Sequence, residues 1–390
     1  MDCAQRRKVR ASGTVGRKLG GSVRQATSEG AQAQRLLPWL LGLGYALAIA
    51  PLGLLTDSAG PLLLPAGDLS HQQGAMVAFM AEPWQWPPTH APLPRAPGGL
   101  NLSETDSVPL AGLLAKLWQS LTGDSPAVLG IWIFLSYALQ PVTAAYLVRC
   151  LGARGGLPAL AAGLIALSLP ALHFRFGHLA LQAHWVVLLA LALAAGSRDS
   201  ERGLRRLALL GLLAWAVLWI NAYLLVMVLA LFSGACLDAL WRGRASRRML
   251  LLGAAPWAAG FALLYLLSGF GDVGPPAWGF GHYSMNLASP VVPQASGLWP
   301  GFAESFASVR PHKQGLESLG HPWRPLADMI DPTGGQYEGF NYLGAGLLLL
   351  ILVAATAPLR LAALLAGRGG LLLACLALAL LSLSNQVWLA

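Results

Sequence analysis

The sequence predicts an all-α integral-membrane protein with about nine transmembrane helices and two large external loops. The chain has 390 residues, of which 55% are hydrophobic and only 11% are charged, whereas a soluble domain carries about 25% charged residues. Apolar runs near the roughly 20 residues of a membrane helix recur along the chain. The net charge of +9 comes mostly from short basic clusters between these runs, so we predict no nucleic-acid partner.

The chain divides at the first apolar run. Residues 1–35 are polar and basic and are predicted to form a disordered cytoplasmic tail, whereas residues 36–390 form the membrane domain. The run at 36–55 exceeds the roughly 7–15 apolar residues of a signal peptide, so we predict an uncleaved first helix. Further charge-free runs of spanning length fall at 126–148, 155–174, 179–196, 249–271, 339–359 and 369–390.

The run at 207–237 is too long for one span and short for two. Basic clusters precede it at 198–206 and follow it at 242–248. Two short helices that turn near Asn221 would place both clusters on the cytoplasmic side, as the positive-inside rule favours. With this division, 20 of the 26 Lys and Arg residues lie inside, whereas 12 of the 17 acidic residues and all eight histidines lie outside or at that membrane face.

Two long external segments, 56–125 and 272–338, therefore hold most of the titratable chemistry. The first predicts short helices at 68–81 and 107–121. The second of these helices has an apolar face opposite Lys116, which is typical of a helix lying in the membrane interface. The four cysteines are scattered without a CxxC pair, so we predict neither a disulfide framework nor a zinc site.

Three groups of polar residues are candidates for a site. Asp68 begins the first short helix, with His71 one turn later, so it is either an N-cap or a reactive carboxylate. Asp106 precedes the second short helix, as a cap or a second carboxylate. The loop at 173–185 carries Arg175, His178 and His184, which suit either a phosphate or lipid headgroups. Further candidates for substrate contact are Glu82, His282, Arg310, Lys313, Glu338 and Asn341.

The pieces GDLSHQQG, PWQWPP, NLSETDSVPLAGLLAKL, LPALHFRFGHLALQAHW, GHYSMNL and YEGFNYLGAG carry a resemblance. In them the chain is similar to an uncharacterised bacterial family of multi-pass membrane proteins, domain of unknown function sixty-three eleven. The layout also resembles the GT-C superfamily of membrane glycosyltransferases, which use lipid-phosphate-linked sugars. That resemblance implies a GT-C-like fold in which Asp68 is the base or a metal ligand and Asp106 is a second candidate, although the first loop has no DxD pair.

The resemblance implies a glycosyltransferase that moves a sugar from a polyprenyl-phosphate donor to an envelope glycan or lipid acceptor. The expected location is the bacterial inner membrane, with the N-terminus in the cytoplasm and the active face outside. The partners would be membrane lipids and the lipid-linked sugar, and a divalent cation is one candidate cofactor. The alternatives are a flippase for lipid-linked saccharides and a non-catalytic envelope assembly protein. Because the family usually continues beyond a span like 369–390, we also expect a C-terminal truncation.

Overall fold

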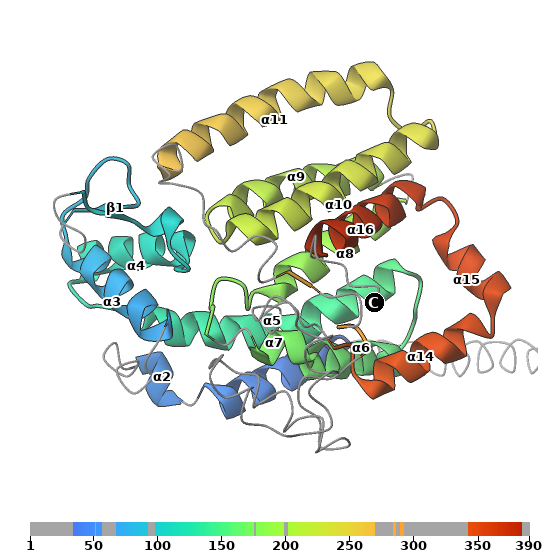
Figure 1. Cartoon of the computed structure of the whole chain (residues 1–390), viewed down its shortest axis with the longest axis horizontal. Coiled ribbons are helices and arrows are strands. Elements are labelled where there is room, and N and C mark those ends of the chain that lie inside the picture. The colour runs from blue at the N-terminus through green and yellow to red at the C-terminus, as the bar shows by residue number, and fades with distance from the viewer. Residues whose placement is uncertain are drawn as a thin grey trace, which may run out of the picture.

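The described part of the protein is built almost entirely from helices (Figure 1). The structure is a computed structural model that describes residues 34–50, 52–56, 68–92, 98–174, 177–198, 202–269, 284–285, 289–291 and 342–383. The helices in chain order are one at 34–49, α2 (Leu52–Thr56), α3 (Asp68–Ala81), α4 (Pro109–Thr122), α5 (Val128–Cys150), α6 (Gly156–Ser168), α7 (Pro170–Phe174), α8 (His184–Gly196), α9 (Gly203–Leu218), α10 (Ala222–Trp241), α11 (Arg247–Ser268), α14 (Ala345–Ala355), α15 (Pro358–Leu365) and α16 (Gly369–Ser382).

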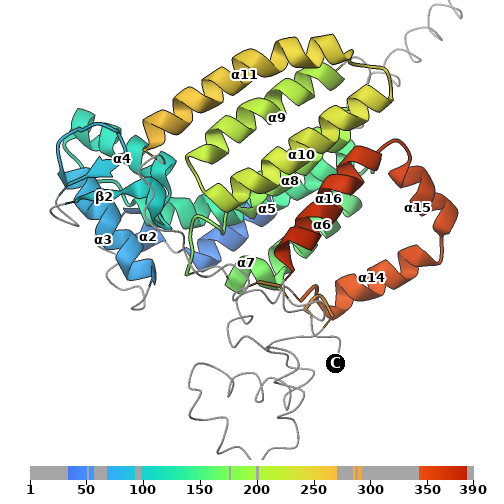
Figure 2. The same ribbon diagram turned by 45° about the horizontal axis from the view of Figure 1, so that its top comes forward.

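The helices pack as a bundle in which α5 and α8 are central. Helices α11, α9, α10 and α16 lie side by side in that order (Figures 1 and 2). Helix α8 packs against both α9 and α10 on one side and against α5 on the other. Helix α5 in turn contacts α2, α4 and α6. The main apolar core therefore runs through α5, α8, α9 and α10.

The prediction of two helices between 207 and 237 is confirmed. Helix α9 ends at Leu218 and α10 begins at Ala222. The side-chain oxygen of Asn221 accepts hydrogen bonds from the backbone N–H of Tyr223 at 2.8 Å and of Leu224 at 3.3 Å, which caps α10. The antiparallel hairpin brings the basic clusters before α9 and after α10 to the same end of the bundle.

Fewer described helices are long enough to cross a membrane than the number of apolar runs predicted. Among the described residues, α5 and α10 are long and apolar enough to cross a membrane, and α14 with α15 passes as a pair bent by 99°. The predicted runs at 36–55, 155–174 and 339–359 are each divided into two helices. The second helix of each pair begins at or directly after a proline in the sequence, namely Pro51, Pro170 and Pro358. Proline lacks the amide hydrogen and disfavours helix in the residue before it, which explains these breaks. The count of nine spans stays a prediction.

The described part of 56–125, the first segment predicted to be external, folds as a small unit of its own. Helices α3 and α4 confirm the two predicted short helices. They enclose an apolar cluster that includes Met76, Phe79 and Leu102. Between them the chain departs from the all-helical prediction, because β1 (His90–Ala91) and β2 (Leu100–Asn101) form a short antiparallel pair, followed by the 3₁₀ turn η2 (Leu102–Glu104).

Lys116 is buried, although helical spacing placed it on the polar face of α4. Its ammonium group donates to the carbonyl of Pro83 at 3.2 Å and lies 4.1 Å from the centre of the Phe79 ring. Burial lowers the pKa of Lys116, and the nearby carboxylate of Glu82 opposes that shift. The face of α4 that carries Lys116 packs on α3. The opposite face, with Leu114, Trp118 and Leu121, is exposed, as expected for a helix in the membrane interface.

Glycines let two neighbouring helices approach α5 closely. A Cβ atom on Gly42, in the helix 34–49, would lie 2.2 Å from the carbonyl oxygen of Ala138. A Cβ atom on Gly163, in α6, would lie 2.9 Å from the ring of Pro141. Both contacts fall within one turn of α5, so three helices meet there through small residues, as is common in membrane bundles.

Gly42→Ala is expected to lower the thermal stability of the purified protein in detergent. The added methyl group meets a backbone oxygen that cannot move without shifting α5. The matched control is Gly44→Ala in the same helix, where an added Cβ atom has nothing within 4 Å and where alanine favours helix by up to about 1 kcal/mol. A scan of tryptophan fluorescence against temperature compares them, and equal stability of the two variants would contradict the close approach.

Candidate functional site

Two of the predicted site residues meet at one end of the bundle. The imidazole Nδ1 of His178 lies 3.2 Å from the carboxylate Oδ2 of Asp106, 72 positions away in the sequence. Because a carboxylate only accepts, the Nδ1 atom carries the hydrogen in this bond. The His178 side chain is 22% exposed and that of Asp106 is 46% exposed. The pair is therefore open to ligands, with the imidazole the better shielded partner.

The loop that carries His178 is fixed to α5 by two side chains. The indole N–H of Trp132 donates to the carbonyl of Leu179 at 2.9 Å, and the Gln182 amide donates to the hydroxyl of Tyr137 at 2.9 Å. Trp132, Tyr137 and Gln182 are all buried. Buried polar groups are costly unless they are paired, so these two bonds favour one loop conformation.

Helix α3 is fixed to the same loop. The amide of Gln72 donates to the carbonyl of Gly177 at 2.9 Å. Asp68 is the first residue of α3, one turn before Gln72, so the start of this helix lies beside the loop of His178. The side chain of Asp68 lies outside the described residues.

Asp106 is held by the turn that leads into α4. The hydroxyl of Thr105 donates to the carbonyl of Leu102 at 2.8 Å and accepts from the N–H of Ser107 at 3.1 Å. One turn later, the N–H of Leu110 donates to the carbonyl of Trp219 at 2.6 Å, which joins the start of α4 to the α9–α10 turn. The position of the carboxylate thus depends on two separate parts of the bundle.

Three buried polar atoms on residues next to the pair or bonded to its loop have no hydrogen-bond partner in the part of the chain that the structure describes. They are the side-chain oxygens of Gln72, Ser107 and Gln182, on residues that are at most 4% exposed. Buried polar atoms are normally paired with protein or ordered water. These two acceptors and one hydroxyl are therefore groups to which a water molecule or a polar ligand could form hydrogen bonds.

His173 has a structural role. Its imidazole Nε2 lies 2.7 Å from the carbonyl of Leu167 and 3.3 Å from the hydroxyl of Tyr45, and its ring stacks on Tyr137 with 5.8 Å between ring centres. These contacts join the helix 34–49, α5 and α7 behind the loop. This histidine supports the Tyr137 side chain that holds Gln182.

The other predicted residues fall in several places. His71 lies on an exposed part of α3, and His184 begins α8 with its N–H donating to the carbonyl of Gln182 at 2.7 Å. Glu82 lies after the far end of α3, about 20 Å along the helix from Asp68, and its charge faces Lys116 rather than the pair. The candidates outside the described residues are Arg175, His282, Arg310, Lys313, Glu338 and Asn341.

Gln72, Trp132 and Gln182 are site residues that sequence reasoning missed. Each is a polar or amphipathic side chain within or beside an apolar stretch, which is the only signal available for them in the sequence. Among the described residues, no group of three His, Cys, Asp or Glu side chains is arranged to hold a metal ion.

Comparison with known families places the chain. Residues 39–390 match a family described as Domain of unknown function (DUF6311). The chain belongs to the DUF6311 family. No curated protein and no solved structure matches it. Membership in DUF6311 confirms the resemblance to an uncharacterised family and covers every residue of the candidate site.

Gln72→Ala is expected to free the loop of His178 without unfolding the bundle. The change removes the bond to Gly177, so amide hydrogen exchange over 177–182 should become faster, while exchange in α5 stays unchanged. His71→Ala, at an exposed neighbouring position in α3, is the control and should leave the loop protected. Mass spectrometry of the exchanged peptides gives the comparison. Equal loop exchange in both variants would show that Gln72 does not hold the loop.

Proposed function

We propose that this DUF6311 protein is a membrane glycosyltransferase that moves a sugar from a polyprenyl-phosphate donor to an envelope glycan or lipid acceptor on the non-cytoplasmic face. The observation that carries the proposal is the Asp106–His178 pair, which sits beside the start of the helix that begins at Asp68. A carboxylate, an imidazole and a second acidic position thus come together where α4 exposes an apolar face. A lipid-linked donor needs this combination of apolar surface and polar chemistry.

In the proposed reaction, an acceptor hydroxyl attacks the anomeric carbon of the donor sugar. The new bond joins the acceptor oxygen to that carbon, and the bond between the carbon and the phosphate oxygen breaks with both electrons on the phosphate. Asp68 takes the acceptor proton as a general base, for which a carboxylate in reach of the hydroxyl is sufficient. The polyprenyl phosphate leaves as a stable anion, so the reaction needs no acid catalyst.

His178 and Arg175 are assigned to the donor phosphate, with His184 at the start of α8 beside them. Asp106 acts as a positioning residue in this scheme. Its carboxylate accepts the Nδ1–H of His178, which fixes the ring and directs Nε2 away from Asp106. The alternative role for the Asp68 carboxylate is to hold a divalent cation, which would activate the acceptor hydroxyl directly.

Asp68→Asn is expected to lower sugar transfer by roughly 100-fold or more, because it removes the general base. Asp106→Asn should give a smaller loss, because asparagine still accepts the bond from His178 but carries no charge. Asp124→Asn is the control, since this exposed acid lies between α4 and α5, away from the pair. The assay follows a labelled sugar from a polyprenyl-phosphate donor in membranes that contain the full chain.

Two results would count against the proposal. Wild-type transfer by Asp68→Asn would remove that residue from catalysis. Movement of a fluorescent lipid-linked sugar across proteoliposome membranes, without any transfer, would instead support a flippase.

A further inference from the structure

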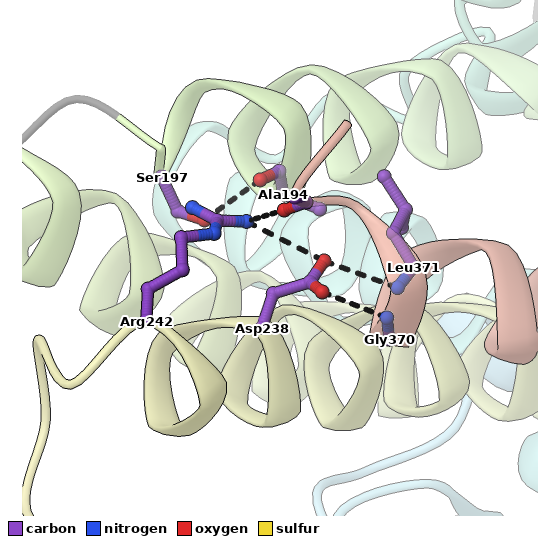
Figure 3. A network of polar contacts seen from close by, with 7 residues as sticks. Ala194, Ser197, Asp238, Arg242, Gly370 and Leu371 are labelled. Atoms are coloured by element: carbon purple, nitrogen blue, oxygen red, sulfur yellow. Dashed lines mark hydrogen bonds and ion pairs between the residues drawn. The ribbon is translucent and has the colours of Figure 1, made fainter. Parts of the chain in front are cut away.

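The opposite end of the bundle contains a second constellation of charged residues. Helix α8 begins at His184 beside the candidate site and ends at Gly196. Its 13 residues make it about 20 Å long, so its two ends lie about that far apart. There it meets the end of α10 and the start of α16, as Figure 3 shows through Ala194 and Ser197, Asp238 and Arg242, and Gly370 and Leu371. The proposed transferase site makes no use of this end.

Asp238 is already fully engaged at this junction. It is buried, and its two carboxylate oxygens accept hydrogen bonds from the backbone N–H groups of Gly370 at 2.7 Å and Leu371 at 3.1 Å. It thereby caps the N-terminus of α16 (Figure 3). Arg242 lies 3.6 Å from the same carboxylate and also donates to the carbonyl of Gly367.

Arg368, the N-cap residue of α16, has no such partner. Arg368 is only 7% exposed, and its Nε and one terminal nitrogen are buried without a hydrogen bond to any described residue. Burial lowers the pKa of Arg368 most, the positive charges of Arg198 and Arg242 lower it further, and Asp238 opposes them. Arg242 donates to the carbonyl of Gly367, the residue before Arg368, and Ser197, the residue before Arg198, lies at the same junction (Figure 3). Arg198, Arg242 and Arg368, which we call the arginine cluster, therefore meet at this junction.

The arginine cluster has an excess of positive charge. Among the described residues, three arginines share this junction with one carboxylate, that of Asp238, which is occupied by backbone amides and Arg242. Arg242 itself has a buried Nε without a partner among the residues that the structure describes. A buried cation is costly unless an anion pairs with it and its N–H groups are satisfied. The missing component of this junction is an anion with several acceptor oxygens.

We propose that the arginine cluster binds a phosphate group, between the ends of α8, α10 and α16. A phosphate offers acceptor oxygens in directions that suit the planar fork of arginine. Arg198 is exposed and gives the ligand a way in, whereas Arg368 is buried. The phosphate belongs either to an anionic lipid headgroup at this membrane face or to a soluble phosphate compound.

The position of the cluster agrees with both sources. The basic residues of the α8–α9 and α10–α11 connections lie at this same end, which the positive-inside rule assigns to the cytoplasm. Basic clusters next to membrane helices on that side attract anionic lipids. The two ends of α8 would then each face a phosphate, one on either side of the membrane.

The test measures thermal stability of the full chain in neutral detergent, with three additions compared at equal ionic strength. They are sodium phosphate, micelles that contain phosphatidylglycerol, and micelles that contain phosphatidylcholine, whose headgroup has no net charge. A ligand that saturates the site should raise Tm by about 2–4 °C. Arg198→Gln and Arg368→Met should lose this rise. Arg360→Gln, at an exposed arginine of α15, should keep it.

The pattern of results identifies the source. A rise with sodium phosphate indicates a soluble phosphate compound, and a rise with phosphatidylglycerol alone indicates a lipid headgroup. Arg368→Met should be at least as stable as wild type without added anion, because it removes an unpaired buried charge. Should that variant fail to fold, Arg198→Gln still decides the outcome. No rise in wild type, or an equal rise in wild type and Arg198→Gln, would overturn the proposal.

Discussion

The attachment of the 177–183 loop to α5 is the constraint on which the candidate site depends. Trp132 and Tyr137 lie one to two turns apart on a helix that is buried against α6 and α8, and each fixes one point of the loop. With the loop fixed, His178 reaches Asp106 and Gly177 receives Gln72. The site is thus assembled on a deeply packed helix of the bundle, which favours the rigid geometry that the proposed reaction needs.

The same helices separate two kinds of chemistry. Carboxylates and imidazoles gather where α8 begins, and guanidinium groups gather where it ends. After His184, helix α8 carries no charged side chain, so its length keeps the two charged regions apart. A protein that handles a lipid-linked phosphate on one face and binds a phosphate on the other would need this division. Both proposals rest on groups that a membrane protein does not bury without compensation.

Sequence reasoning was most successful where the pattern is local. The hairpin of α9 and α10 followed from two basic clusters around one long apolar run, and α3 and α4 followed from helical spacing. Asp106 and His178 were each selected from the chemistry of their surroundings. Their direct pairing was not predicted, because 72 residues and several helices separate them in the chain. Lys116 was predicted on the exposed polar face of α4 but is buried. Its burial comes from contacts with α3 and the residues after it, and helical spacing within α4 cannot predict contacts with another helix.

The most direct test of the central claim is chemical cross-linking between Asp106→Cys and His178→Cys in a chain whose native cysteines are replaced. A short bismethanethiosulfonate reagent should join the two positions in intact membranes, and mass spectrometry would identify the product. The yield should fall when Trp132→Phe is added, because the bond that holds Leu179 is lost. A cross-link that forms equally well between Asp124→Cys and His178→Cys, or that is unaffected by Trp132→Phe, would contradict a loop held by α5 against Asp106.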